Sequence, residues 1–268
     1  MGLTYALITG ASSGIGEVFA RELVRSGRSC ILVARSTDKL ESLSAELRSL
    51  YPHVEIVVIP RDLSEPNAAA ALFAETQARE LEVDLLINNA GFGSFGDFEQ
   101  LLLDRQIEML RLNISALVEL THFYLHPMRA RRAGAVINVA STAAFFPGPY
   151  FATYAATKAF VLSFSQALFV ENRKHGVLVV ALCPGATETN FFEVAKMPTF
   201  AHRLRLQTPQ QVVYEAIRGL RNGRPVTVSG VTNKVMAIAS RIIPRVIMLE
   251  LLSAMFEKMY REQNERLG

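Results

Sequence analysis

Short apolar runs alternate with amphipathic stretches along most of the chain. The runs are YALIT, CILVA, VEIVVI, DLLINN, AVINVA and VLVVAL. Continuous apolar runs of this kind are typical of strands that are buried on both faces of a parallel sheet. Stretches between them, such as IGEVFARELVRSG and TDKLESLSAELRSL, repeat apolar residues at helical spacing. The pattern predicts an α/β fold, a single doubly wound Rossmann-type parallel sheet flanked by helices.

The end of the chain departs from this alternation. We expect one Rossmann-type domain over residues 1–230 and a helical apolar extension over 231–268 that packs on it. After Pro244, apolar residues recur at helical spacing at Val246, Leu249, Leu252 and Phe256, and Met248, Leu251 and Met255 broaden that face. Charges interrupt the run before it reaches the ~20 apolar residues that a membrane span needs. Three roles stay open: a lid or subunit contact, a membrane-surface contact, or a loosely docked end.

Composition excludes several classes of protein. Half of the 268 residues are hydrophobic and the net charge is +3, which is too weak to indicate a nucleic-acid partner. Cys30 and Cys183 lie in strand-like runs and read as buried thiols of a reducing compartment. His122 and His126 lack a third ligand, so we expect no metal. LTYALITG enters a strand without a leader, which favours a cytoplasmic protein with no signal peptide.

A glycine-rich turn, TGASSGIG, joins the first predicted strand to the first predicted helix. Glycines allow a tight turn and a close approach to a pyrophosphate, and the helix N-terminus offers free N–H groups to it. The spacing is G-x-x-x-G-x-G rather than the commoner G-x-G-x-x-G. The predicted phosphate-binding residues are Gly10, Ser12, Ser13, Gly14, Ile15 and Gly16.

Tyr154 and Lys158 are spaced i and i+4, which places both side chains on one face of a helix. Taken alone, the pair is consistent with an aromatic ring covered by a lysine stem. A second interpretation is chemical. A phenol has an ordinary pKa of about 10, and a nearby ammonium lowers it, so that the tyrosine can exchange protons near neutral pH.

Five motifs, in this order, closely resemble the short-chain dehydrogenase/reductase family. They are TGASSGIG, NNAG at Asn88–Gly91, Ser141, Tyr154-Ala-Ala-Thr-Lys158 and Pro184-Gly185, within about residues 3–230. The resemblance implies a catalytic set of Asn113, Ser141, Tyr154 and Lys158. Tyr154 would act as acid and base, Ser141 would hold the substrate carbonyl, and Lys158 would bind the nicotinamide ribose. Asn113 would hold a water in a proton relay toward Lys158.

The same resemblance implies further cofactor-binding residues, namely Asp62, Leu63, Asn89, Ala90, Gly91, Pro184, Gly185, Thr187 and Thr189. Asp62 would accept from the adenine amino group. It also suits the start of a helix before Ser64-Glu65-Pro66, and both roles can hold together. Backbone near Thr187 and the Thr189 hydroxyl would bind the nicotinamide carboxamide.

The end of the second strand indicates which nicotinamide cofactor binds. A carboxylate at that position would favour NAD, but the chain has Ala34 followed by Arg35. A guanidinium can form a charge-assisted bidentate bond with a 2′-phosphate, which predicts NADP(H). The alternative is that Arg35 only ends the strand in solvent. Ser13 stands where many NADP-preferring relatives have a basic residue, so Arg35 would carry most of the discrimination.

Three apolar stretches are expected to border the substrate: Phe92-Gly93, Ala143 to Tyr150, and Asn190-Phe191-Phe192. They predict a small hydrophobic ketone, aldehyde or alcohol, unless the aromatic rings only pack against one another. The resulting hypothesis is an NADP(H)-dependent oxidoreductase that forms a homodimer or homotetramer. A cofactor-sensing binding protein is the alternative from another class. An epimerase or dehydratase is disfavoured because no nucleotide-sugar domain is evident.

Overall fold

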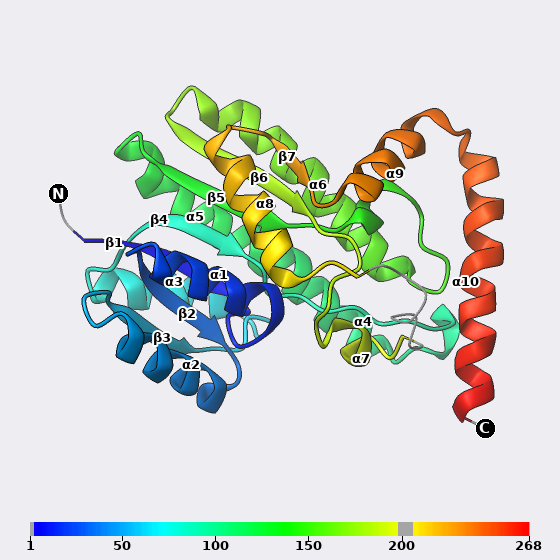
Figure 1. Ribbon diagram of the computed structural model, residues 1–268, viewed down its shortest axis with the longest axis horizontal. Coiled ribbons are helices and arrows are strands. Elements are labelled where there is room, and N and C mark those ends of the chain that lie inside the picture. The colour runs from blue at the N-terminus through cyan, green and yellow to red at the C-terminus, as the bar shows by residue number, and fades with distance from the viewer. Residues whose placement is uncertain (1–2, 198–205, 268) are drawn as a thin grey trace.

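In the computed structural model, which describes residues 3–197 and 206–267, seven strands form one parallel sheet in the order β3-β2-β1-β4-β5-β6-β7 (Figure 1). The strands are β1 (Thr4–Thr9), β2 (Ser29–Ala34), β3 (Ile56–Pro60), β4 (Glu82–Asn88), β5 (Gly134–Val139), β6 (Val177–Cys183) and β7 (Val226–Val228). The six apolar runs account for β1 to β6. The edge strand β7 has only three residues, which is too short to stand out as an apolar run.

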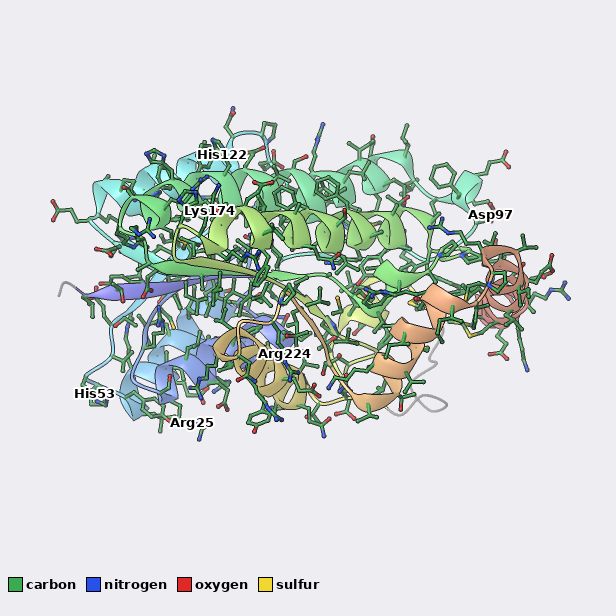
Figure 2. All side chains as sticks on the ribbon, turned by 90° about the horizontal axis from the view of Figure 1, so that it is seen from above. Arg25, His53, Asp97, His122, Lys174 and Arg224 are labelled. Atoms are coloured by element: carbon green, nitrogen blue, oxygen red, sulfur yellow. The ribbon has the colours of Figure 1, made fainter. Side chains whose placement is uncertain are left out.

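Helices cover both faces of the sheet, as the two layers in Figure 2 show. One face is covered by α1 (Gly14–Arg25), α2 (Thr37–Leu50) and α8 (Pro209–Arg221). The other face is covered by α3 (Ala68–Ala78), α5 (Leu117–Ala130) and α6 (Ala152–Arg173). The remaining helical segments are η1 (Phe98–Gln100), α4 (Leu103–Leu110), the π-helix η2 (Arg111–Ala116), η3 (Thr142–Phe145), α7 (Phe191–Val194), α9 (Val231–Ile242) and α10 (Arg245–Leu267). This arrangement confirms the doubly wound α/β sheet.

The central strands are almost entirely buried, which explains why their sequences are continuously apolar. Cys30 on β2 and Cys183 on β6 are free, buried thiols, as the apolar runs predicted. Burial raises the pKa of each thiol to about 12. Both cysteines therefore stay protonated at neutral pH and act as small apolar groups of the core.

The order of the strands changes direction between β1 and β4. From β1 the chain continues outward to β2 and β3, and it then returns to β4 on the other side of β1. Ligands of open α/β sheets bind at such a switch point, outside the carboxyl ends of the strands. The glycine-rich turn follows β1 and the segment Asn89–Gly91 follows β4, so the topology brings both to this crevice.

The helix α10 stands at one end of the molecule and follows α9 through Pro244 (Figure 1). It contacts the domain through Phe256, whose ring centroid lies 6.3 Å from that of Phe95, and through Tyr260, which stacks on Tyr150 at 4.6 Å. The hydroxyl of Tyr260 donates to Gln100 Oε1 at 2.8 Å. These contacts hold the later turns of α10 against the domain.

The apolar face expected on this helix is only partly buried. Leu252 and Phe256 pack against the domain, whereas Val246 and Leu249 are 70% and 45% exposed. The reason is that the first turns of α10 extend past the loops on which its later turns rest. Among the described residues, no helix combines the length and the apolar character that crossing a membrane requires.

Candidate active site

A cavity of about 1510 Å³ runs along the carboxyl edge of the sheet. It extends from the glycine-rich turn at one end to α7, α9 and α10 at the other. All the site residues named from the sequence line this cavity except Gly16 and Asn113, which lie behind its wall. The topology therefore gathers residues from positions 10 to 189 into one continuous space.

The glycine-rich turn has the backbone geometry that a pyrophosphate cradle requires. Gly10 and Gly14 have φ angles of +65° and +57°, which favour glycine. A Cβ on Gly14 would lie 2.9 Å from Thr189 Cγ2, so a larger residue would close the gap between the turn and the opposite loop. The side chain of Ser13 makes no capping bond to α1, which leaves N–H groups of the first helical turn available to an anion. These features fit a dinucleotide.

Asn89 fixes the turn to the neighbouring strand. Its Nδ2 donates to the carbonyl oxygens of Thr9 at 2.9 Å and Gly10 at 3.2 Å. The Thr9 hydroxyl in turn accepts from the backbone N–H groups of Asn89 and Ala90. Asn89 therefore binds the backbone of the glycine-rich turn.

The end of the cavity beside β2 and β3 carries Arg35 and Asp62. Arg35 Nη1 lies 3.4 Å from Asp62 Oδ2 and 3.4 Å from Glu108 Oε1, and the Arg35 side chain is 56% exposed. The guanidinium is thus accessible to a phosphate while two carboxylates hold it. The role of Glu108 was not evident from the sequence, because it lies 73 residues from Arg35.

Asp62 also shapes the loop that follows β3. Its Oδ1 accepts from the backbone N–H of Ser64 at 2.9 Å and from the Ser64 hydroxyl at 2.6 Å. Burial alone would raise the pKa of Asp62, but the hydrogen bonds from Ser64 and the charge of Arg35 outweigh it, so the pKa is lowered. The helix expected to start before Ser64 begins only at Ala68, after Asn67, so Asp62 stabilises a turn and not a helix N-terminus. Its other oxygen faces Arg35.

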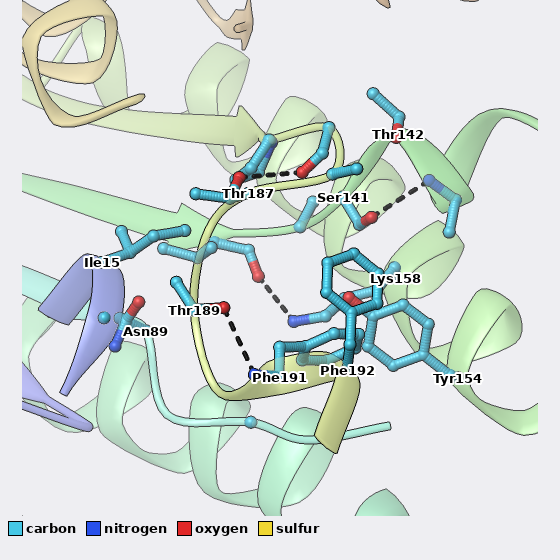
Figure 3. Close-up of a pocket in the computed structure, with 18 of the residues that line it drawn as sticks. Ile15, Asn89, Ser141, Thr142, Tyr154, Lys158, Thr187, Thr189, Phe191 and Phe192 are labelled. Carbon is cyan, nitrogen blue, oxygen red and sulfur yellow. Dashed lines mark hydrogen bonds between the residues drawn. The ribbon is translucent and has the colours of Figure 1, made fainter. Parts of the chain in front are cut away.

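Ser141, Tyr154 and Lys158 meet beside the carboxyl end of β5 (Figure 3). Ser141 Oγ accepts from the backbone N–H of Ala143 at 3.1 Å, which fixes it at the start of η3. Lys158 Nζ donates to the carbonyl oxygen of Val139 at 2.8 Å. Its ammonium lies 5.7 Å from the centroid of the Tyr154 ring.

The pKa of Tyr154 differs from the sequence-based expectation. Burial raises the pKa of Tyr154 to about 12, and the Ser141 hydroxyl offsets only part of that rise. Burial also lowers the pKa of Lys158 to about 8. The expected lowering of the phenol pKa by Lys158 is thus absent in the chain alone. The reason is that the rings of Phe151 and Phe191, with centroids 4.4 Å and 5.1 Å from that of Tyr154, exclude water from the phenol.

Asn113 lies within the π-helix η2, a rare bulge that recurs at functional sites. Its side-chain Oδ1 accepts from Phe92 N at 3.2 Å, and its Nδ2 donates to Phe92 O at 3.0 Å and to Thr157 Oγ1 at 3.2 Å. The side chain therefore holds the loop after β4 against α6. A Cβ on Gly91 would lie 2.9 Å from Asn113 Oδ1 and 3.5 Å from Lys158 Nζ, so the glycine permits this close packing.

The loop from Pro184 to Thr189 faces the glycine-rich turn across the cavity (Figure 3). Thr187 Oγ1 donates to the carbonyl oxygen of Gly185 at 2.9 Å. Thr189 Oγ1 accepts from the backbone N–H of Phe191 at 3.3 Å, at the start of α7. Both hydroxyls thus stabilise the loop on this side of the cavity.

The wall of the cavity near α7 and α10 is mainly apolar, whereas Gln211, Glu215 and Lys234 of α8 and α9 add polar groups elsewhere. Of the stretches expected to border the substrate, Phe92, Ala143, Phe146 and Asn190 to Phe192 line the cavity, but Gly93 and the rest of Ala143 to Tyr150 do not. Aromatic rings also pack on one another there, so both interpretations of these stretches hold in part. The helix α10 was not expected in this wall, yet one of its faces lines the cavity through Met248, Leu252, Met255, Phe256 and Met259. Their spacing of three or four residues was the signal that could have found them.

The guanidinium of Arg105 lies 3.6 Å from the centroid of the Phe92 ring, and Arg105 also pairs with Glu108 at 2.7 Å. The contacts of Glu108 with Arg35 and Arg105, and of Arg105 with Phe92, therefore link the two ends of the cavity.

In the part of the chain that the structure describes, no group of three His, Cys, Asp or Glu side chains could hold a metal ion.

Comparisons with known proteins found a matching family model and several similar proteins. The family model described as short chain dehydrogenase matches residues 4–197. A very-long-chain 3-oxoacyl-CoA reductase-like protein of Arabidopsis thaliana is 38% identical over 188 residues, which are 68% of this chain and 59% of that protein. The chain thus spans about three fifths of the length of that curated relative.

Two solved structures are also similar. A short-chain dehydrogenase from Sphingobium yanoikuyae in complex with NADPH has a TM-score of 0.79 and 33% identity, over 84% of this chain and 87% of that one. A bulky-bulky ketone specific alcohol dehydrogenase from Comamonas testosteroni has a TM-score of 0.75 and 31% identity, over 85% and 86% of the two chains.

Proposed function

Because the chain belongs to the short-chain dehydrogenase family, we propose that it is an NADP(H)-dependent oxidoreductase that interconverts a hydrophobic ketone or aldehyde and its alcohol. The observation that carries the proposal is the convergence of Ser141, Tyr154 and Lys158 in the same cavity as the glycine-rich turn. A protein that only sensed a nucleotide would need the turn but not a buried acid and its helpers.

The dinucleotide would lie along the carboxyl edge of the sheet. The N–H groups at the start of α1 would bind its pyrophosphate, and Lys158 would bind the nicotinamide ribose. The bound cofactor supplies the hydride. Arg35 supports a preference for a 2′-phosphate, because its guanidinium is exposed at the adenosine end and no carboxylate occupies position 34.

Tyr154 would donate the proton during reduction. With a pKa of about 12, its phenol is protonated at neutral pH and can deliver a proton to the oxygen that becomes an alcohol. Ser141 would hold that oxygen through its hydroxyl, which lines the same part of the cavity as the phenol. Asn113 would act by fixing Phe92 and Thr157, and its proposed water relay toward Lys158 stays a prediction.

The cavity wall supports a bulky apolar substrate. Aromatic residues of α7 and the apolar face of α10 line one part of the cavity, and a bulky apolar group would fit against them. The names of two relatives, a 3-oxoacyl-CoA reductase-like protein and a bulky ketone alcohol dehydrogenase, are consistent with such a carbonyl compound. A dimer or tetramer and a cytoplasmic location stay predictions from the sequence.

The direct test measures NADPH consumption with hydrophobic ketones, aldehydes and 3-oxoacyl thioesters, for the native protein and Tyr154→Phe. We expect the variant to lose about 10²- to 10⁴-fold in kcat while it still binds NADPH. The matched control is Tyr124→Phe, which removes a buried hydroxyl bonded to Thr76 in the core and should leave turnover intact.

Turnover by Tyr154→Phe within a few-fold of native, with the same substrate, would refute the proposed role of Tyr154. Tight NADPH binding without turnover across the whole panel would instead favour the cofactor-sensing protein.

A further inference from the structure

The corner between α9 and α10 exposes an unusual set of aliphatic side chains. We call this set the corner patch; it comprises Val235, Ile238 and Ile242 on α9 and Val246, Ile247 and Leu249 on α10. Ile242 and Val246, on either side of Pro244, are 77% and 70% exposed. The α9 members are spaced i, i+3 and i+7 and therefore share one helix face. Scattered single apolar residues are ordinary on a surface, but a contiguous patch marks a contact.

Two arginines lie within the corner patch. Arg241 and Arg245 bracket Ile242 to Pro244, and both are exposed. Among the described residues neither has an ion-pair partner, whereas Lys234 and Arg261 on the same helices pair with Glu215 and Glu257. The corner thus combines aliphatic side chains with two uncompensated positive charges.

The corner patch adjoins the apolar end of the cavity. Met236 and Met255, on the two helices, are each 43% exposed and also line the cavity. Ile243, at the corner itself, lines it too. Figure 1 shows both helices at the end of the molecule away from the glycine-rich turn and α2. An apolar molecule could therefore pass from a surface that covers the patch into the cavity without crossing water.

We propose that the corner patch docks on the surface of a lipid layer that carries anionic headgroups. The aliphatic residues enter the boundary between headgroups and acyl chains, and Arg241 and Arg245 bind headgroup phosphates or carboxylates. That the docked protein takes its substrate from this layer rests on the proposed function, whereas the docking of the corner patch does not depend on it.

A second copy of the chain fits the corner patch less well. A two-fold contact centred on the corner would place the arginines of one copy against the same arginines of the other, and Glu250, exposed next to Leu249, supplies only one carboxylate per copy against Arg241 and Arg245. Such juxtaposed like charges disfavour association, whereas an anionic lipid surface complements them.

The test is flotation of the protein with vesicles of phosphatidylcholine alone or mixed with phosphatidylserine, at low and high salt, without cofactor or substrate. We expect the native chain to float with the mixed vesicles and less so at high salt. Arg241→Gln with Arg245→Gln should lower the bound-to-free ratio by about tenfold or more. Ile242→Ser with Val246→Ser should lower it similarly even at low salt. All these residues are exposed, so the variants should fold.

The matched control is Arg221→Gln with Arg224→Gln, which removes two exposed arginines at the end of α8 and should float like the native chain. The proposal is overturned if the native chain stays free of mixed vesicles, or if both corner variants float like it. If instead Ile242→Ser with Val246→Ser converts a dimer into a monomer and flotation is absent throughout, the patch binds a second copy. Because no step measures turnover, failure here leaves the proposed oxidoreductase untouched.

Discussion

Lys158 is a buried ammonium that bonds a backbone carbonyl, that of Val139, and no carboxylate within the described chain. Burial holds its pKa at about 8 in the folded state, below its ordinary value of 10.5. Between these two pH values the unfolded chain binds a proton that the folded chain does not. The contribution of Lys158 to the free energy of unfolding therefore rises with pH across this window and is lowest below it.

This linkage makes a stability prediction for Lys158→Met. We expect the variant to be more stable than the native chain at pH 7, by up to about 3 kcal/mol, and the difference to shrink as the pH rises from about 8 toward 10.5. Denaturant unfolding at several pH values measures it, and the paired design cancels the titration of other groups. A difference that stays constant over this range would show that the ammonium is well solvated in the folded chain.

Arg35 contacts the carboxylates of Asp62 and Glu108, so a 2′-phosphate on the cofactor would compete with these two groups for its guanidinium. Arg35→Ala should weaken NADPH binding by about 10- to 100-fold and change NADH binding little. Glu108→Gln should strengthen NADPH binding, because it removes a charge that would repel the 2′-phosphate, while Glu171→Gln on α6 should not. Titrations followed by the fluorescence of the reduced nicotinamide give these constants. Equal losses for NADPH and NADH in Arg35→Ala would contradict the assignment.

The turn between β1 and α1 constrains Gly14 in two ways, through its backbone conformation and through its neighbours across the cavity. Gly14 has φ +57° and Gly223, after α8, has φ +59°, but only Gly14 has a neighbour within reach of an added Cβ. Gly14→Ala and Gly223→Ala should each lower the free energy of unfolding by about 1–2 kcal/mol. Only Gly14→Ala should also weaken NADPH binding, because its methyl group would meet Thr189. Thermal melts and cofactor titrations of the two variants separate backbone strain from blockage of the cavity.

Features that depend on local sequence were predictable at the element scale. The strands β1 to β6 and the helix α2 follow from apolar periodicity, and the turn follows from its glycines. The contact of Glu108 with Arg35 and the bonds of Asn113 to Phe92 join segments 73 and 21 residues apart, so no spacing rule could find them. The pKa of Tyr154 was misjudged because it depends on the rings of Phe151 and Phe191, whose positions only the packed structure gives.

At the scale of the whole molecule, α10 is held by few residues. Phe256→Ala should remove most of its anchorage, at a local cost of about 3 kcal/mol, because Phe256 is 8% exposed and packs against Phe95. We expect faster proteolysis and amide hydrogen exchange within α9 and α10 while the sheet stays protected. Leu249→Ala, 45% exposed on the same helix, serves as the control. Equal protection of α10 in both variants would mean that other contacts hold the helix.

The boundary of the family match, at residue 197, divides the cavity wall in two. The matched part carries Ser141, Tyr154 and Lys158, whereas α10, with Leu252 and Phe256, lies outside it. The helix α10 therefore adds wall residues that can diverge independently of Ser141, Tyr154 and Lys158, whereas the aromatic wall residues of α7 lie inside the match. A chimaera in which α9 and α10 come from a relative should catalyse the same reaction as this chain, with a substrate preference closer to that of the relative.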